Sequence, residues 1–462
     1  MTETKPVPPT RRQFIRQSVC AAVGMTSLAS TVFDLRRVAA AAPLTAADYK
    51  ALVCVFLYGG NDCNNMLVPY DPADYASYAA ARMGLALPRT ALLPINLVGG
   101  GDGRLWSLHP NMVGLQGLFN QQKMAVLGNV GPLVAPVTQA DYINGTAALP
   151  PQLFSHSDQT THWQTSIPDQ PPQTGWGGRV ADMLHALNGT SQISMSLSLA
   201  GINTFQVGNV VTQLQVSPNG AFGLDGYTAD TTDPASNALR ALLARSYGNL
   251  FQSGYRDVFS RALGDNQLLQ TALAGLPPLT TVFPASDLGQ QLLTVAHLIQ
   301  ARAALGQQRQ VFFVATGGFD THGGQLPAHV QLLQDVSDSL AAFYAATVEL
   351  QVPGSVTAFT ASDFGRTFVS NNDPNGDGSD HGWGSHHLIV GGGVLGGRLF
   401  GRVPTLAIDG PDDTGDGRWI PTTSVDEYSA TLAKWFGVSP TEMRTVFPNL
   451  NRFSNPDLGF MG

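Results

Sequence analysis

The chain has 462 residues, with 25 lysines and arginines against 33 aspartates and glutamates. Residues 1–42 contain six of these basic and two of these acidic residues, so the remaining 19 basic and 31 acidic residues give a formal charge of −12. Because this remainder has no basic stripe, we do not expect nucleic acid as a partner.

Residues 1–42 are predicted to be a twin-arginine export signal. Residues 10–16 read Thr-Arg-Arg-Gln-Phe-Ile-Arg, a moderately apolar stretch follows over residues 18–33, and small residues at 38–43 suit cleavage. The apolar stretch is short and rich in Ala, Ser and Thr, which argues against a membrane anchor. We therefore expect the twin-arginine export machinery as a partner, and a mature chain of residues 43–462 in the periplasm or outside the cell. We expect no integral membrane segment in that mature chain.

Strand and helix patterns alternate along the mature chain. Residues 190–232 are rich in Ser, Gly and Asn and are predicted to form an inserted β-rich cap, whereas residues 234–306 are predicted to be mainly helical. Alternation of this kind predicts an α/β fold with a mostly parallel sheet and helices on both faces. The predicted strands of the sheet are Ala51–Tyr58, Met124–Asn129, Val311–Ala315, Val356–Thr360 and Leu388–Val390.

Local signals support single features of this arrangement. Ser424 and Glu427 are predicted to form a capping box at the start of the last helix, which Gly437 ends. Cys54 and Cys63 could pair in an oxidising compartment. Cys54 lies in the middle of a predicted strand, which argues against that disulfide.

Acidic and histidine side chains follow three of the predicted strands. The carboxyl ends of parallel strands meet at one edge of a sheet, so these side chains are expected to converge there. Aspartate oxygen and histidine nitrogen together suit a divalent transition metal, zinc first. The residues concerned are Asp62 after the first strand, Asp320 and His322 after the third, and Asp363, Asp380 and His381 after the fourth.

Each of these segments also has a structural reading. The turn around Asp62 could simply bond its own backbone. The segment 373–378 resembles the start of a calcium loop, but Gly384 stands where an EF-hand needs a bidentate glutamate, so a solvated loop is favoured. His381 is followed by His386 and His387, and three histidines in seven residues are typical of a metal site.

Ser155 opens a predicted helix after a proline-rich loop. One interpretation is a capping box with Asp158. The other is a nucleophile at a helix N-terminus, where free N–H groups stabilise an anionic oxygen. For an anionic substrate, Arg179 or Arg366 could act as a bidentate clamp, and either could instead form a buried ion pair.

Taken together, these segments resemble the twin-arginine-exported domain-of-unknown-function family fifteen-oh-one. That family is similar to a distant branch of the alkaline phosphatase and sulfatase superfamily. The segments that carry the resemblance are Gly59–Pro69, Ser155–His156, Gly318–His322, Ser362–Thr367, Asp380–Trp383 and Pro421–Ser424.

The resemblance implies an alkaline phosphatase/sulfatase-like fold and a role for each matching residue. Asp62 would bind metal after the first strand, and Ser155 would be the nucleophile. The superfamily's Asp/His pair is usually spaced by four residues, whereas Asp320 and His322 are spaced by two. A final histidine ligand would be His386 or His387.

The sequence therefore predicts an exported metal-dependent hydrolase of a small-molecule or polymer ester. Sulfatases of that superfamily make a formylglycine in a Cys/Ser-x-Pro/Ala-x-Arg motif. Phosphate is favoured over sulfate, because neither Cys54, Cys63 nor Ser155 lies in such a motif. Two divalent ions about 4 Å apart are expected, zinc first, with manganese or calcium as alternatives. The rival prediction is a non-catalytic, metal-stabilised binding or surface scaffold. The predicted ligands are Asp62, Asp320, His322, Asp363, Asp380, His381 and His387, and the predicted catalytic residues are Ser155, His156 and Arg366.

Overall fold

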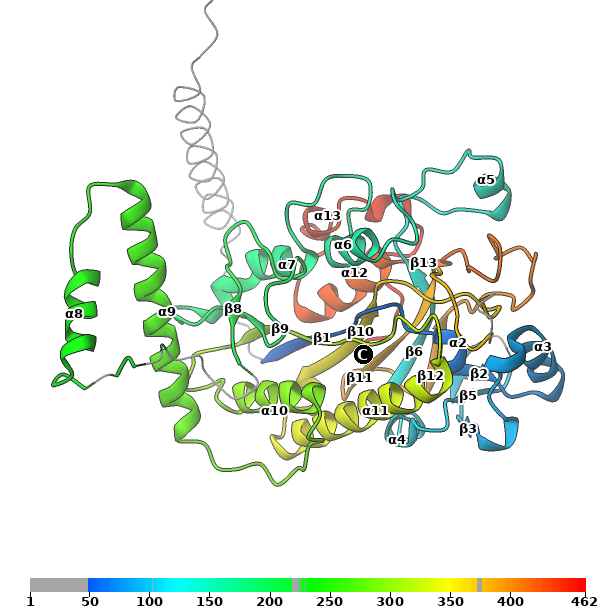
Figure 1. Ribbon diagram of the computed structural model, residues 1–462, viewed down its shortest axis with the longest axis horizontal. Helices are drawn as coiled ribbons and strands as arrows, with labels where there is room; N and C mark the ends of the chain where they lie inside the picture. The colour runs from blue at the N-terminus through cyan, green and yellow to red at the C-terminus, as the bar shows by residue number, and fades with distance from the viewer. Residues whose placement is uncertain (1–48, 102, 218–223, 225, 229, 372–375) are drawn as a thin grey trace, which may run out of the picture. The chain divides into compact units, whose positions relative to one another are not determined.

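A computed structural model describes residues 49–101, 103–217, 224, 226–228, 230–371 and 376–462 (Figure 1). The predicted export signal, residues 1–42, lies outside these ranges. Within them, no helix has both the length and the apolar character needed to cross a membrane.

A ten-stranded sheet forms the centre of the fold. Its strands lie in the order β4-β12-β6-β11-β10-β1-β9-β7-β8, and β13 pairs with β6. Only β11 runs antiparallel to its two neighbours, β10 and β6, among the described pairings. The strands are β1 (Lys50–Leu57), β4 (Gly99–Gly100), β6 (Met124–Gly131), β7 (Ser196–Ser198), β8 (Leu214–Gln215), β9 (Arg309–Thr316), β10 (Val356–Ser362), β11 (Ser385–Gly391), β12 (Arg398–Gly401) and β13 (Thr423–Ser424).

The three central strands, β10, β1 and β9, are parallel neighbours. Val55 of β1 lies opposite Thr360 of β10 on one side and Val314 of β9 on the other. Their sequences are nearly continuous apolar runs because both faces of the sheet are covered, so every side chain of β10 is buried. In consequence, the three strands end at the same edge.

Helices pack on both faces of this sheet (Figure 1). One face contacts α4 (Val113–Asn120), α10 (Asp287–Gln300) and α11 (Gln325–Glu349). The other contacts α6 (His156–Thr165), α7 (Trp176–Leu184), α12 (Val425–Phe436) and α13 (Met443–Val446). The predicted α/β class, a mostly parallel sheet between two helical layers, is confirmed.

A second, three-stranded sheet lies beside the loop that follows β1. It has the order β2-β5-β3, with β2 (Leu67–Pro69), β5 (Trp106–Leu108) and β3 (Leu93–Pro94), and α2 (Cys63–Met66) and α3 (Pro72–Arg82) adjoin it. Residues 190–232, predicted to form a β-rich cap, contribute β7 and β8, which extend the edge of the large sheet instead of forming a separate one. Residues 234–306 are mainly helical, as predicted, and include α8 (Pro234–Leu243) and α9 (Leu250–Ala274).

Two local features, the start of α12 and the cysteine pair, have clear structures. Ser424 and Glu427 form the reciprocal capping box of α12, and Gly437 ends that helix, as predicted. Cys54 and Cys63 are both buried and both free thiols, so the disulfide is not formed.

Candidate metal centre

The loops at the carboxyl edge of the sheet bring acidic and histidine side chains together. The loop after β9 carries Asp320 and His322, and the loop between β10 and β11 carries His381. His156, the first residue of α6, approaches from the adjoining proline-rich loop. One nitrogen from each of His156 and His381 and one oxygen of Asp320 all lie within 4.8 Å of one another.

Three histidine rings of this cluster have their Nδ1 atoms occupied. Each Nδ1 faces an oxygen that can only accept a hydrogen bond from it, a carboxylate or a backbone carbonyl. Nδ1 therefore holds the proton of the neutral ring, and Nε2 keeps its lone pair. The pairs are His156 with Asp363 at 2.7 Å, His322 with Asp380 at 3.0 Å, and His381 with the Phe154 carbonyl at 2.7 Å.

The three Nε2 atoms converge on Oδ1 of Asp320. Their distances from it are 3.4 Å for His156, 3.0 Å for His322 and 3.4 Å for His381. The Nε2 atoms of His322 and His381 lie only 2.9 Å apart. Nε2 of His156 is buried and has no hydrogen-bond partner among the described residues. His156, Asp320 and His381 offer nitrogen and oxygen donors of the types that zinc accepts, and His322 adjoins Asp320 and His381.

Arg366 fixes the position of Asp320. Its buried guanidinium donates from Nη1 to Oδ1 of Asp320 at 2.8 Å and to the Gly59 carbonyl at 3.0 Å, and from Nη2 to the Ser379 carbonyl. Partial burial raises the pKa of Asp320, but the hydrogen bond and charge of Arg366 outweigh this effect, so the pKa lies below its ordinary value. Of the two predicted roles for Arg366, the structure favours the ion pair, formed between the buried guanidinium and the partly exposed Asp320.

Arg179, the other predicted clamp, lies away from this cluster. Its guanidinium donates to the backbone carbonyls of Thr165, Thr174 and Val446. Burial lowers the pKa of Arg179 to about 10. The side chain therefore ties α6, α7 and α13 together.

Asp363 and Asp380 support histidines. The buried Asp363 accepts from the Gly59 amide at 3.1 Å with the same Oδ2 that contacts His156. Burial raises the pKa of Asp363, and its hydrogen bond with His156 offsets part of that rise. Burial lowers the pKa of His381, which favours the neutral ring that a metal requires.

Asp62, predicted as a ligand, has other partners. It is fully buried as the N-cap of α2, where its Oδ1 accepts from the Asn64 amide at 3.0 Å. Its Oδ2 accepts from Gln325 at 2.5 Å and forms a buried ion pair with Arg82. Asp62 therefore lies outside the cluster, because hydrogen bonds within its own turn and from distant side chains satisfy both of its oxygens.

His387, also predicted as a ligand, lies inside the core. Its ring centroid is 4.6 Å from that of Trp163 and 5.9 Å from that of Tyr428, and its Nδ1 lies 3.3 Å from the Thr360 hydroxyl. Successive strand residues point to opposite faces, so the neighbouring His386 points the other way and its Nδ1 accepts from the Asn129 amide at 3.0 Å. Neither histidine belongs to the cluster.

Buried neutral histidines should make the fold sensitive to acid. Burial lowers the pKa of His387 to about 3, and that of His109, His329 and His386 to about 4, from an ordinary value of 6.5. The unfolded chain binds more protons than the folded one between these values, so stability is lost as the pH falls from 6.5 towards 4. We expect a loss of up to about 1.4 kcal/mol per pH unit for each such histidine.

The variant His387→Phe keeps a ring between Trp163 and Tyr428 and removes one titrating group. Its free energy of unfolding, measured in urea at several pH values, should fall less steeply below pH 6.5 than that of the wild type. Parallel pH profiles for the two proteins would contradict this assignment.

Ser155 is the N-cap of α6, but its hydroxyl does not cap the backbone. Its Oγ donates to Oδ2 of Asp158 at 2.5 Å and lies 3.2 Å from Oγ of Ser157. The predicted reciprocal capping box is therefore absent, because the two side chains bond each other. The hydroxyl faces the first turn of its own helix, whereas its neighbour His156 faces the cluster.

An open cleft adjoins the cluster. Its volume is about 390 Å³, and its wall contains one arginine, Arg418. Nε of Arg418 donates to the His381 carbonyl at 2.9 Å, Nη1 contacts Asp416 at 2.8 Å, and the guanidinium lies 5.6 Å from the centre of the Phe154 ring. No motif marks Arg418 in the sequence, so its place at this cleft could not be predicted. The lining residues are Tyr142, Phe154, His322, Asp380, His381, Thr414 and Arg418.

The chain is similar to several solved structures and matches one protein family. It is similar to the crystal structure of Ps i-CgsB, with 11% identity and a TM-score of 0.35 over 88% of this chain and 77% of that one. Ps i-CgsB in complex with k-i-k-neocarrahexaose is 10% identical, with a TM-score of 0.33 over 88% of this chain and 77% of that one. PsFucS1 sulfatase from Pseudoalteromonas sp. is 9% identical, with a TM-score of 0.35 over 85% of this chain and 68% of that one. No curated protein matches. Residues 49–443 match the family described as "Protein of unknown function (DUF1501)", so the chain belongs to that family, as its sequence predicts.

Proposed function

We propose that this protein is a metal-dependent hydrolase of phosphate or sulfate esters. One observation carries the proposal: the Nε2 atoms of three histidines lie 3.0–3.4 Å from Oδ1 of Asp320, while each Nδ1 faces an oxygen acceptor. A divalent cation bound by this arrangement would have the nitrogen and oxygen donors that zinc accepts. Its members are His156, Asp320, His322 and His381, with zinc as the first choice of ion and manganese or calcium as alternatives.

The proposal takes one ion in place of the two expected from the sequence. Asp62 and His387 are left out of the ligand set, since both are buried among other partners. Asp363 and Asp380 become supporting groups that hold His156 and His322 in the correct tautomer and orientation.

A divalent ion bound there supplies Lewis-acid activation of the ester. Arg418, in the wall of the cleft, binds the negative charge of the substrate with its guanidinium. The His381 carbonyl, which accepts from Nε, holds that guanidinium in place. The rings of Tyr142 and Phe154 form a surface for the alcohol portion of the ester. The hydroxyl of Ser155 donates a hydrogen bond to Asp158. We therefore propose that water and not Ser155 attacks the ester.

The place of action is proposed from the sequence. Residues 1–42 have the features of a twin-arginine signal, so we propose that the enzyme works in the periplasm or outside the cell.

Turnover of aryl phosphates and aryl sulfates by the exported, metal-containing protein tests the function. We expect Arg418→Ala to raise KM by about tenfold or more with a smaller change in kcat, because the lost contact binds the ground state as well as the transition state. Ser155→Ala should keep its activity. Arg452→Ala, which removes an exposed partner of Asp169, is the control and should leave both constants unchanged.

Two outcomes would count against the proposal. Absence of turnover of any ester by protein that holds its ion would favour a metal-stabilised scaffold. Loss of turnover in Ser155→Ala with the ion still bound would return Ser155 to the role of nucleophile.

A further inference from the structure

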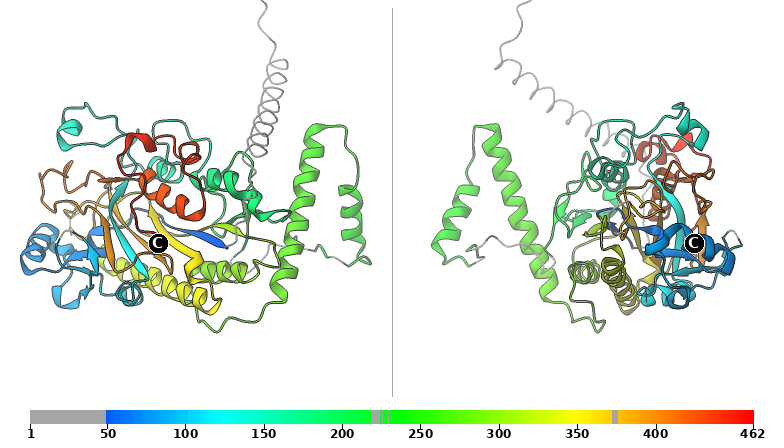
Figure 2. Two further views of the ribbon diagram at one scale, coloured as in Figure 1. Left: turned by 180° about the vertical axis from the view of Figure 1, so that it is seen from behind. Right: turned by 45° about the vertical axis from the view of Figure 1, so that its right-hand side comes forward.

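The helical hairpin formed by α8 and α9 is poorly covered by the rest of the protein. Figures 1 and 2 show α8 and the first half of α9 standing away from the large sheet and its covering helices. Among the described residues, α8 buries only Ser236, and α9 buries only Asp265 and Leu269. A short helix such as α8 has little stability of its own in water, so this exposure needs an explanation.

The face of α9 that repeats with a spacing of four and three residues is apolar except at Asp265. Its C-terminal part, which includes Leu269 and Ala272, packs against the main hydrophobic core. Its N-terminal part is uncovered, and Phe251, Tyr255 and Val258 are 75%, 71% and 65% exposed. The same face that the body covers at one end is therefore open to solvent at the other.

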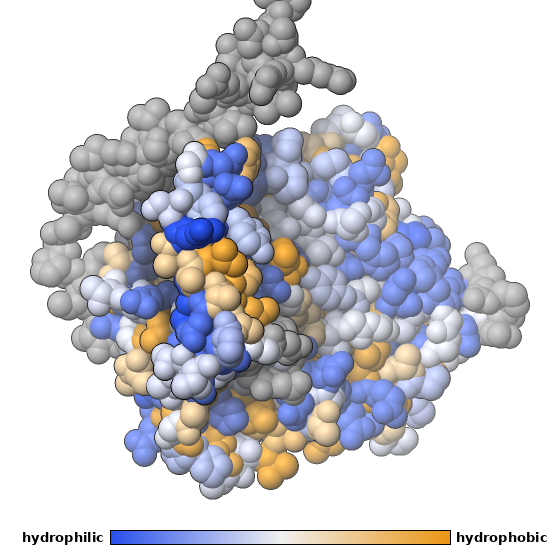
Figure 3. Space-filling view, turned by 60° about the vertical axis from the view of Figure 1, so that its left-hand side comes forward, coloured by the Kyte–Doolittle hydropathy of each residue, from blue (hydrophilic) through white to orange (hydrophobic). Residues whose placement is uncertain are grey.

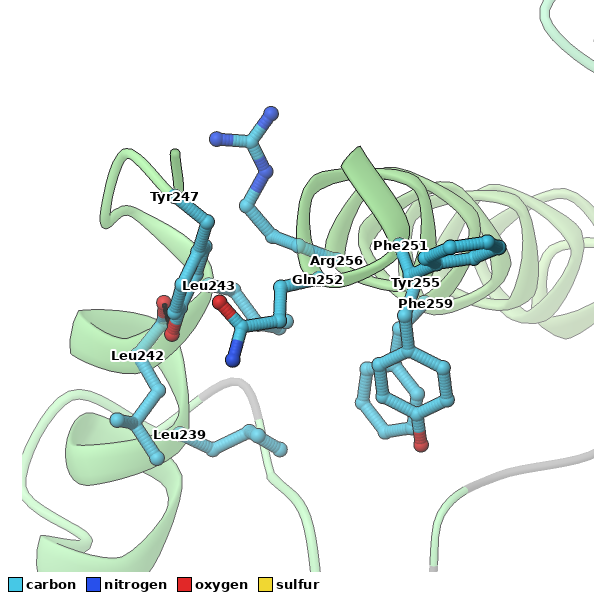
Figure 4. A pocket seen from close by; sticks show the side chains of 9 residues that line it. All are labelled: Leu239, Leu242, Leu243, Tyr247, Phe251, Gln252, Tyr255, Arg256 and Phe259. Atoms are coloured by element: carbon cyan, nitrogen blue, oxygen red, sulfur yellow. Dashed lines mark hydrogen bonds between the residues drawn. The ribbon is translucent and has the colours of Figure 1, made fainter. Parts of the chain in front are cut away.

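An apolar cleft separates the two helices at this open end. Its volume is about 460 Å³, and it is open to solvent. Figure 4 shows Leu239 and Leu242 of α8 on one side and the rings of Tyr255 and Phe259 of α9 on the other, with the guanidinium of Arg256 turned away from them. The remaining lining residues are Leu243, Tyr247, Phe251 and Gln252.

The charge of this segment is opposite to that of the chain. Residues 239–261 contain four arginines and a single aspartate, whereas acidic residues outnumber basic ones in the whole sequence. Arg245 and Arg261 are exposed. Figure 3 shows hydrophobic and hydrophilic side chains gathered side by side on this side of the molecule. A two-fold pairing of two such hairpins would bring like charges together, whereas an anionic surface complements them.

We propose that the outer end of the α8–α9 hairpin, residues 239–261, docks on an anionic lipid surface. Phe251, Tyr255 and Val258 enter the boundary between headgroups and acyl chains, where amphipathic helices bury their apolar face. Arg245 and Arg261 contact lipid phosphates. The arrangement is peripheral, since no described helix is long and apolar enough to span a bilayer. This surface is independent of the proposed hydrolase site.

Flotation of the full mature protein with phosphatidylglycerol-containing vesicles tests the proposal, with pure phosphatidylcholine vesicles for comparison. The wild type should float with the anionic vesicles and lose affinity at high salt. Arg245→Glu with Arg261→Glu should weaken binding by at least about tenfold. Phe251→Glu with Tyr255→Glu should weaken it similarly, because charges are placed on the inserted face. Val282→Glu, at a single 86% exposed position outside the hairpin, is the control and should bind as the wild type does.

Light scattering on the same samples identifies a rival occupant. A wild-type dimer that dissociates in Phe251→Glu with Tyr255→Glu, without vesicle binding, would overturn the proposal in favour of a second copy of this chain. Equal flotation of all the variants would also overturn it, since the hairpin would then not be the docking surface. Far-ultraviolet circular dichroism of each variant establishes that it is folded, so lost binding cannot come from lost structure.

Discussion

Replacing His381 with alanine is expected to lower the affinity of the protein for zinc by more than about a hundredfold. Changing a residue that merely supports a ligand costs about ten- to a hundredfold in affinity, and removal of a ligand costs more. His381 contributes an Nε2 lone pair that faces both Asp320 and His322. Its alanine variant leaves at most three protein donors of the proposed four.

Bound metal, measured by mass spectrometry on protein purified without chelators, gives the readout. We expect about one ion per wild-type chain and almost none in His381→Ala. Asp380→Ala should give an intermediate loss, because Asp380 acts on His322 through a single hydrogen bond of 3.0 Å. His185→Ala removes a histidine outside the cluster and serves as the control.

Other outcomes would change the assignment. Two ions per chain would restore the two-metal centre expected from the sequence. An ion that stays bound in His381→Ala would show that the cluster is not its site. Calcium bound in equal amounts by all four proteins would favour a structural ion elsewhere in the chain.

The sheet and its functional edge could be predicted because their signals are local. Apolar runs that end in glycine after Tyr58 and Thr316 predict strands that are buried on both faces. The carboxyl ends of parallel strands necessarily lie at the same edge of the sheet. This is why Asp320, His322 and Asp363 arrive near one another. The direction of β11, which runs antiparallel, had no such local signal.

The exact partners within that edge could not be predicted, because they depend on contacts between distant residues. His156 and Asp363 are 207 positions apart in the chain, and their 2.7 Å contact sets which nitrogen of His156 is free. Histidine density around position 381 was a misleading signal for His387. Strand geometry and the surrounding aromatic rings place that residue in the core.

Asp62 illustrates the same limit most clearly. From the sequence, it is an acidic residue in a glycine turn after a strand, which suits a ligand and a structural cap equally well. The choice is made by Arg82, twenty residues later and fully buried, which forms an ion pair with it. A lone buried carboxylate in this position would be unstable, so the arginine explains why an aspartate is tolerated there.

Arg82→Ala is therefore expected to destabilise the fold by about 3–5 kcal/mol, the usual result of removing one partner of a buried ion pair. The change leaves the charge of Asp62 in the core and removes donors from the Thr367 and Phe368 carbonyls, both at 3.0 Å from Nη1. The free energy of unfolding in urea gives the measurement. Arg452→Ala, which breaks the partly exposed pair with Asp169, should cost less than about 1 kcal/mol.

Asp62→Asn separates the structural role from the metal role. An asparagine keeps the shape of the side chain but loses the charge that Arg82 compensates, so stability should fall while the metal content of the folded protein stays at the wild-type value. A folded Asp62→Asn protein that had lost its ion would make Asp62 a ligand after all. A destabilisation of Arg82→Ala no larger than that of Arg452→Ala would mean that the buried pair does not stabilise the loop after β1.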